Sequence, residues 1–141
     1  MTELRRLFDD LVGLEIAVWD AVDARLRQDC GLTAGQFMPM RVVAATPGCR
    51  VLDVAAQLQI TVGAASKVVD RVEAAGHCLR RPNPGDRRSS LIELTPAGEV
   101  ALAGAEVVFE QELQERLGDV LSPTALARFG GDLAKLRAAN R

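Results

Sequence analysis

The chain has 141 residues, of which 48% are apolar and 26% are charged, and its formal net charge at pH 7 is −2. This composition excludes a disordered chain, and the length suits a single globular domain. No apolar run approaches the roughly 18 residues that a membrane-spanning helix needs, and the first residues do not read as a signal peptide. We therefore expect a cytoplasmic protein that does not associate with a membrane.

The charges are unevenly distributed along the chain. Residues 50–90 hold seven basic and four acidic side chains, a local net charge of +3, which leaves −5 for the remainder. A basic central segment in an acidic chain indicates a face for a polyanion such as nucleic acid. The alternative is chance clustering of charge on a solvated surface.

Two helices are predicted before the basic segment. Apolar residues from Leu4 to Leu26 recur at helical spacing, which predicts a long helix closed by Gly31. A helix of about 25 residues is long for a globular protein and suggests packing against a partner. A second helix is predicted over residues 34–45, where Pro39 predicts a kink or a later start.

The basic segment begins with two short helices. One is predicted over residues 51–58, and after a turn at residues 59–61 a second runs from its N-cap, Thr61, to about Ala75, where Gly76 stops it. This spacing is typical of a helix-turn-helix. The second helix is expected to bury Val62, Ala65, Val69 and Val72, and to present Gly63, Ser66, Lys67, Asp70 and Arg71 outward.

A charged hairpin follows. Strands are predicted over residues 78–81 and 91–94, joined through a turn rich in Pro, Gly and Asp that delivers Arg87 and Arg88. A hairpin with guanidinium groups at its tip has the shape of a wing that reaches a phosphate backbone or a minor groove. Thr95 then serves as the N-cap before Pro96, at the first position of the next helix.

The C-terminal part of the chain is again helical. One helix is predicted from Pro96 to about Val120 and a last one from Pro123, with an end expected to fray because of Gly130 and Gly131. The predicted fold is mainly α with a small β-hairpin wing. It places a winged helix-turn-helix over residues 34–96, between helices over residues 1–30 and 97–141, in a single domain.

The residues from Asp53 to Glu99 resemble the winged helix-turn-helix of the MarR family of bacterial transcriptional regulators. The resemblance rests on pieces that occur in order: Asp53-Val54-Ala55, Asp70-Arg71-Val72-Glu73 with Gly76, Arg80-Arg81-Pro82, the pair Asp86 and Arg88, and Leu94-Thr95-x-x-Gly98. No single piece is specific, but their order and spacing are.

The resemblance implies a homodimer in which the terminal helices, residues 1–30 and 97–141, intertwine. Each recognition helix would enter a major groove and each wing the flanking minor groove. A two-fold dimer needs a pseudo-palindromic operator with half-sites about one helical turn apart. A ligand or redox signal typically changes DNA affinity in this family, so we expect a ligand-responsive repressor with a small, aromatic effector.

The wing residues are the first expected DNA contacts. Arg88 is expected in the minor groove, because a planar guanidinium suits a narrow, negatively charged groove, and Asp86 is expected to brace that guanidinium. Arg87 is expected to contact phosphate. The alternative for Asp86 and Arg88 is a structural ion pair that holds the turn.

The helix-turn-helix supplies the remaining expected contacts. Ser66 and Lys67 match family positions that face the major groove, and Thr61 caps a helix start that can meet phosphate. Arg71 either touches phosphate or pairs with Asp70 or Glu73. Direct base readout is expected to be thin, because residues 62–65 are small and apolar. The full expected set is Thr61, Ser66, Lys67, Arg71, Arg80, Asp86, Arg87 and Arg88.

An effector crevice is a second expected site. Trp19, Phe37 and Met40 can line it, although apolar residues at this spacing are more often core. His77, the single histidine, senses pH, touches a ligand or is a hydrogen-bonded structural residue.

The three cysteines, Cys30, Cys49 and Cys78, leave open a redox-sensing regulator. Buried and inert thiols are favoured because no basic neighbour set is evident for Cys30 or Cys49, whereas Arg80 and Arg81 near Cys78 keep the redox alternative open there. A protein-interaction module without specific DNA binding is the other alternative. We expect no enzyme, cofactor or metal, because the sequence shows no catalytic constellation or metal-ligand spacing.

Overall fold

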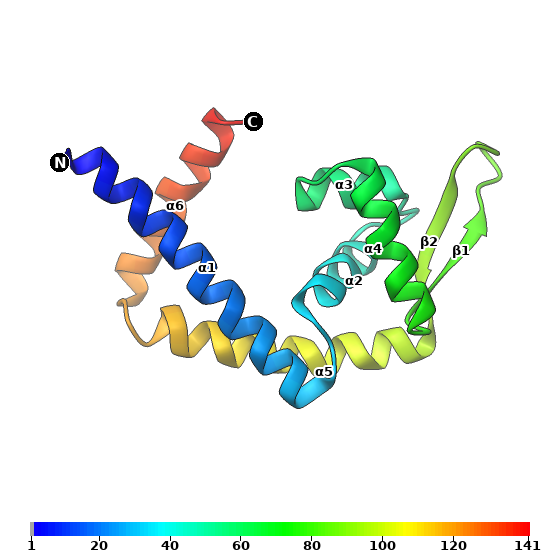
Figure 1. The fold of residues 1–141 in the computed structure, drawn as a ribbon, viewed down its shortest axis with the longest axis horizontal. Coiled ribbons are helices and arrows are strands. Elements are labelled where there is room, and N and C mark those ends of the chain that lie inside the picture. Colours follow the sequence, from blue (N-terminus) through cyan, green and yellow to red (C-terminus); the bar gives the residue numbers. More distant parts are fainter. Residues whose placement is uncertain (1) are drawn as a thin grey trace. The chain divides into compact units, whose positions relative to one another are not determined.

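The computed structural model of the protein describes residues 2–141. The elements, in chain order, are α1 (Glu3–Cys30), α2 (Ala34–Ala45), α3 (Val51–Leu58), α4 (Val62–Ala74), β1 (Cys78–Pro82), β2 (Ser90–Leu94), α5 (Pro96–Leu113), the π-helix η1 (Gln114–Gly118) and α6 (Pro123–Ala139) (Figure 1). The prediction of a mainly helical fold with one hairpin is confirmed.

The contacts divide the chain into two compact units. The central unit is Asp23–Val108, and the terminal unit combines the chain up to Val22 with Phe109–Arg141. The winged segment expected over residues 34–96 lies within the central unit. Over residues 2–141, no helix combines the length and the hydropathy that crossing a bilayer demands.

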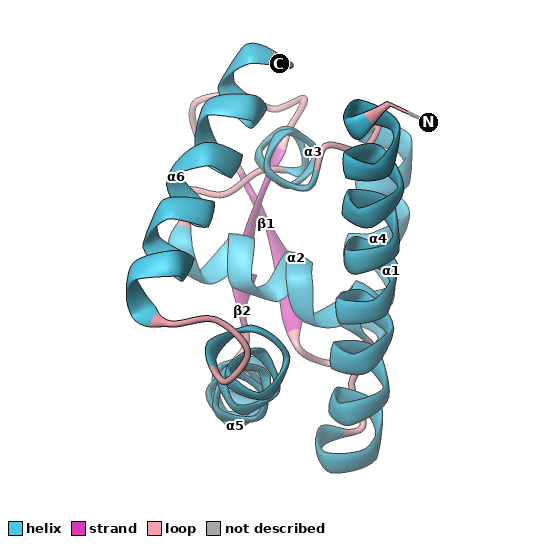
Figure 2. Ribbon diagram, turned by 90° about the vertical axis from the view of Figure 1, so that its left-hand side faces the viewer, coloured by secondary structure: helices cyan, strands magenta, loops and turns pink. Residues whose placement is uncertain are grey.

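The central unit holds a closed apolar core. Helices α2, α3 and α4 pack on one another, and the hairpin packs against them, as Figure 2 shows in separate colours for helix and strand. Burial of these side chains is the main force that holds the unit together. The largest fully buried side chains are Leu26, Phe37, Pro39, Met40, Cys49, Val54 and Val69.

Helix α2 begins at Ala34, so the later start expected from Pro39 is wrong. A capping box forms, in which the Thr33 hydroxyl accepts from the Gln36 N–H at 3.0 Å and Gln36 Oε1 accepts from the Thr33 N–H at 3.1 Å. Asp23 adds a third cap by accepting from the Ala34 N–H at 2.7 Å. These caps fix the helix start, and burial of Pro39 in the core compensates for its missing N–H.

Helices α3 and α4 form the helix-turn-helix as predicted. The Asp53 carboxylate accepts from the Arg50 N–H at 2.8 Å at the start of α3. The turn contains Gln59 in the left-handed region, at φ 55°. Thr61 then caps α4 by accepting from the Ala64 N–H at 3.1 Å. Two local caps and one sharp turn therefore set the geometry of the pair.

The wing is an antiparallel hairpin in which Cys78 pairs with Leu94 and Pro82 with Ser90. Each strand is one residue longer than predicted. The Ile92 N–H also donates to the Cys49 carbonyl at 2.7 Å, so the segment before α3 contacts the open edge of β2. This bond ties the wing to the helix-turn-helix.

The wing closes where α5 begins. The Thr95 N–H donates to the His77 carbonyl at 3.0 Å, and the Thr95 hydroxyl donates to the Gly76 carbonyl at 2.6 Å while accepting from the Gly98 N–H at 3.0 Å. A Cβ on Gly98 would collide with the backbone carbonyl of His77. Glycine is therefore required for this close approach.

The terminal unit contains the outer part of α1, the end of α5, η1 and α6. The helix predicted to about Val120 continues to Gly118, but its last part is not α-helical, because α5 ends at Leu113 and the π-helix η1 follows directly. The Asp119 N–H donates to the Gln114 carbonyl, five residues back, at 2.8 Å, and this widens the last turn. The Ser122 hydroxyl then caps α6.

Helix α6 continues past both glycines to Ala139. At its end, the Asn140 side-chain amide donates to the Leu136 carbonyl at 2.8 Å. The side-chain hydrogen bond satisfies one of the terminal carbonyls of the helix.

Gly98→Ala is expected to lower the free energy of unfolding by about 1–3 kcal/mol, because its methyl group forces α5 away from His77. The matched control is Gly104→Ala in the same helix, where an added Cβ meets nothing within 4 Å. The control should stabilise the protein by up to about 1 kcal/mol. Urea denaturation followed by circular dichroism measures both, and equal effects of the two changes would contradict the close-approach argument.

Candidate nucleic-acid interface

Helix α4 presents a polar face away from the core. Ala65, Val69 and Val72 are buried, whereas Lys67 and Arg71 are exposed. Val62 is also exposed, so its predicted burial is wrong: at the first helical position it lies beyond the reach of α2 and α3. The expected contacts Lys67 and Arg71 are thus available to a ligand, and Ser66 is half-buried.

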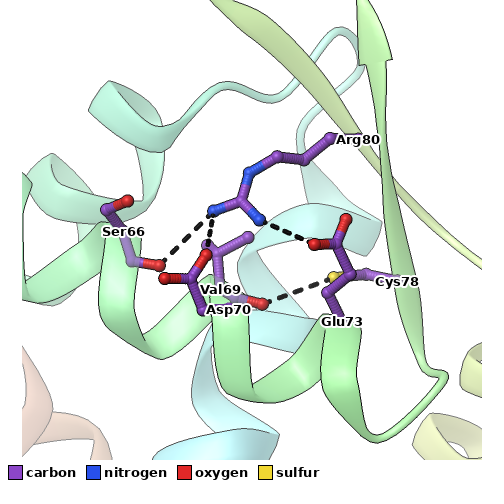
Figure 3. A network of polar contacts seen from close by, with 6 residues as sticks. All are labelled: Ser66, Val69, Asp70, Glu73, Cys78 and Arg80. Carbon is purple, nitrogen blue, oxygen red and sulfur yellow. Dashed lines mark hydrogen bonds and ion pairs between the residues drawn. The ribbon is translucent and has the colours of Figure 1, made fainter.

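Arg80 fastens the wing to α4 (Figure 3). Its Nη2 donates to Asp70 Oδ1 at 2.8 Å and to the Ser66 carbonyl at 3.4 Å, and its Nη1 donates to Glu73 Oε1 at 3.0 Å. The Arg80 side chain is only 22% exposed. The sequence predicts that Arg80 contacts DNA, but the structure gives it a structural role, because its guanidinium donates to three acceptors of the recognition helix.

The same bonds bear on Arg71. Both acids that could pair with it, Asp70 and Glu73, bind Arg80. Among residues 2–141 no ion pair involves the Arg71 guanidinium, so the expected pairing with either acid does not form, and the phosphate contact stays a prediction. Arg80 also offsets one of the two negative charges of α4, and with Lys67 and Arg71 the group has a net charge of +1.

The wing tip is ordered by two short side chains. Asn83 Oδ1 accepts from the Gly85 N–H at 3.0 Å, and Asp86 Oδ1 accepts from the Arg88 N–H at 2.9 Å. The expected brace between Asp86 and the Arg88 guanidinium is therefore wrong: the carboxylate binds the backbone N–H, as in an Asx turn. Asp86 shapes the tip, and Arg87 and Arg88 extend from it into solvent.

The other arginine of β1 is paired across the hairpin. Arg81 Nε donates to Glu93 Oε2 at 2.6 Å, between two side chains that are each more than half exposed. Neighbouring residues of a strand point to opposite faces. Arg80 thus turns toward α4, whereas Arg81 stays at the surface with its own counter-charge.

The expected effector residues differ in burial and in the unit to which they belong. Phe37 and Met40 are fully buried in the core of the central unit, and Trp19 is exposed in the terminal unit. His77 is half-buried, and its Nδ1 has no hydrogen-bond partner among the described residues, so the hydrogen-bonded structural role is wrong for that atom.

An open cavity of about 520 Å³ lies elsewhere in the central unit. It is bounded by the end of α2, by β2 and by α5, and its rim includes Glu93, Glu99 and Glu106. None of the four expected effector residues lines it. Among the residues that the structure describes, no cluster of His, Cys, Asp and Glu is suited to hold a metal.

The thiols are poorly suited to redox sensing. Burial, together with the nearby Asp53, raises the pKa of Cys49 to about 11, and burial together with Glu73 raises the pKa of Cys78 to about 11 despite the opposing effect of Arg80. Burial followed by the charge of Asp29 also raises the pKa of Cys30. A raised pKa suppresses the reactive thiolate, and the structure therefore favours inert burial.

Sequence reasoning missed the fastening role of Arg80 and the ordering role of Asn83. The signal for Asn83 was present, because an Asn two residues before a glycine in a turn often bonds the local backbone. The signal for Arg80 was weaker. Asp70 and Glu73 lie three residues apart and so share a face of α4, but their partner comes from another element.

These elements define a winged helix-turn-helix protein. A model of the MarR family matches residues 32–90, which span the helix-turn-helix and most of the wing. A Thauera aromatica protein assigned as the transcriptional regulator of the hcr operon is 32% identical over 92 residues, 63% of this chain. The match spans 55% of the length of that relative.

Two solved structures resemble this chain over nearly its whole length. CouR, a transcriptional repressor bound to a 23-mer DNA duplex, is 27% identical with a TM-score of 0.87, and the match covers 97% of this chain and 96% of that one. Sco3205, a MarR family regulator from Streptomyces coelicolor in complex with DNA, is 20% identical with a TM-score of 0.91. That match covers 100% of this chain and 94% of Sco3205.

Residues 32–90 of this chain thus match the MarR family, and the likeness to CouR extends over nearly the whole chain. Proteins of this family are transcription regulators rather than enzymes, which confirms the prediction that the chain is not an enzyme.

Arg80→Ala is expected to lower the free energy of unfolding by about 1 kcal/mol, because two partly exposed ion pairs and one carbonyl contact are lost. Arg81→Ala is the matched control, since it removes the same charge from the same strand but only one exposed pair. Urea denaturation should show a clearly smaller decrease in the free energy of unfolding for the control. Equal losses would mean that Arg80 does not fasten the wing.

Cys49 and Cys78 are expected to react slowly with iodoacetamide in the native protein. A pKa of about 11 instead of 9.0 leaves about 100-fold less thiolate at pH 8. Alkylation of each cysteine, followed by mass spectrometry with and without urea, measures the difference. Rapid native modification of Cys78 would instead support the redox-sensing alternative.

Proposed function

We propose that this protein is a sequence-specific DNA-binding transcriptional regulator that binds a pseudo-palindromic operator as a homodimer. One observation carries the proposal: Arg87 and Arg88 extend from an ordered wing tip, and in the same unit the exposed face of α4 carries Lys67 and Arg71. Two basic elements in one unit suit the two grooves of a DNA duplex, whereas a small ligand would need only one of them.

Each element has a distinct proposed role. Arg88 enters the minor groove, where a planar guanidinium suits the negative potential, while Arg87, Lys67 and Arg71 bind phosphates. At the start of α4 the Thr61 hydroxyl binds the Ala64 N–H, and the helix dipole there favours a phosphate oxygen. Ser66 faces the groove beside Lys67.

The terminal unit supports the homodimer. Leu4, Phe8 and Ile16 of α1 are 76%, 66% and 54% exposed, and no residue of α6, which is described throughout, is buried. Helices with apolar surface of this extent require a partner to cover it. A second copy of the same helices provides a matching surface, and a two-fold dimer doubles the DNA contacts.

The finer regulatory role is supported by relatives. CouR is a transcriptional repressor bound to DNA, and we propose repression here as well. Response to a small, aromatic effector stays part of the proposal and rests on the family resemblance. A protein that acts on chromosomal DNA belongs in the cytoplasm of a bacterial cell.

Binding to duplexes from the protein's own upstream intergenic region, followed by fluorescence anisotropy, tests the proposal. One duplex should bind well above random sequence at physiological salt, with two chains per duplex by analytical ultracentrifugation. Arg88→Ala should weaken binding by about five- to 150-fold, since a groove contact contributes about 1–3 kcal/mol. Arg88→Lys should retain only part of the binding affinity, because lysine keeps the charge but lacks the planar guanidinium.

Arg81→Ala is the control for charge, because it removes one arginine from the same hairpin and should have a smaller effect. Equal and weak binding to all sequences would contradict the specific-regulator proposal. An unchanged affinity in Arg88→Ala would favour the protein-interaction module instead.

A further inference from the structure

The first turn of α4 presents an apolar surface on the face where the bases of a bound duplex would lie. Val62 is 50% exposed, and Gly63 and Ala64 are exposed beside it. Thr61, directly before them, uses its hydroxyl to cap Ala64. The N-terminal end of the recognition helix therefore offers methyl groups rather than amides or guanidinium groups.

Packing within the chain does not explain these residues. A Cβ built on Gly63 meets nothing within 4 Å, and its φ is not positive, so neither close approach inside the protein nor backbone conformation requires glycine. Alanine is the better helix former. Packing within the described chain therefore neither requires glycine at position 63 nor buries Val62.

The charged residues near this turn indicate the kind of partner that suits it. Lys67 follows one helical turn after Gly63, and Arg71 one turn after Lys67, both exposed. An apolar patch on the basic face of a recognition helix is complementary to a groove lined by phosphates, with apolar groups on its floor.

The major groove of DNA presents one such apolar group, the C5-methyl of thymine, which apolar side chains recognise by direct contact. In a helix-turn-helix, the N-terminal residues of the second helix contact base edges. We propose that Val62 and Ala64 read thymine methyl groups in each half-site, and that Gly63 lacks a side chain so that this turn can approach the bases closely. The inference rests on the proposed function, and it names thymine as the base that the recognition helix selects.

The polar groups of α4 support this assignment. Asp70 and the Ser66 carbonyl bind Arg80 and are not available to bases. Of the outward polar side chains, Lys67 and Arg71 are suited to phosphates. Methyl contacts from the first turn then provide much of the direct readout by this helix.

The test starts with selection of bound sequences from a randomised duplex library by the full chain. The selected half-sites should contain thymine at fixed positions. Each such thymine is then replaced by deoxyuridine, which keeps the base pair and removes only the methyl group. Affinity should fall about fourfold per contacted methyl, and about fifteenfold when the same position is changed in both half-sites.

Two variants assign the effect to residues. Val62→Ala should reduce the preference for thymine over deoxyuridine at one position of each half-site. Leu52→Ala is the matched control, because Leu52 is equally apolar and 54% exposed, but lies on α3. The control should leave that preference unchanged. Gly63→Leu should keep or raise the melting temperature and weaken binding to the selected duplex by more than tenfold.

The outcomes separate the two proposals. Specific binding with equal affinity for thymine and deoxyuridine duplexes would overturn methyl reading and leave the proposed function intact. A thymine preference that Val62→Ala does not change would overturn the assignment to α4. A selection that yields no preferred sequence would overturn the proposed function and this inference with it.

Discussion

The wing depends on one joint, at which the chain returns to the end of the recognition helix. Thr95 donates its hydroxyl to the Gly76 carbonyl and its N–H to the His77 carbonyl, at 2.6 and 3.0 Å. Gly98 lets the first turn of α5 lie against that backbone, where any side chain would collide. Because both ends of the hairpin meet at this joint, a two-stranded sheet that would be marginal alone becomes a fixed arm.

Arg80 is the second fastening, and it also sets the charge of the proposed DNA face. Its guanidinium binds the carboxylates of Asp70 and Glu73 and offsets one of their two negative charges from within the protein. With Lys67 and Arg71, which are exposed, the group keeps a net charge of +1. One internal cation thus links the wing to α4 and favours a polyanionic partner.

The two units differ in how they satisfy their apolar surface. The central unit buries its large side chains, including Phe37 and Met40, in its own core. The terminal unit leaves apolar residues of α1 such as Leu4 and Phe8 in solvent. This contrast is the observation behind the proposed homodimer, because exposed apolar helices gain stability when a second surface covers them.

The sequence by itself determined the elements and their order, because caps, turns and helical periodicity act within a few residues. Thr61 and Gly76 bound the recognition helix where the sequence predicted. Only the tertiary structure decided which partners the charged side chains take. Arg80 binds Asp70, ten residues away, and Val62 is exposed although its spacing predicts burial. These outcomes depend on which elements meet in space, and a periodic pattern in one helix carries no information about the helix or strand that packs against it.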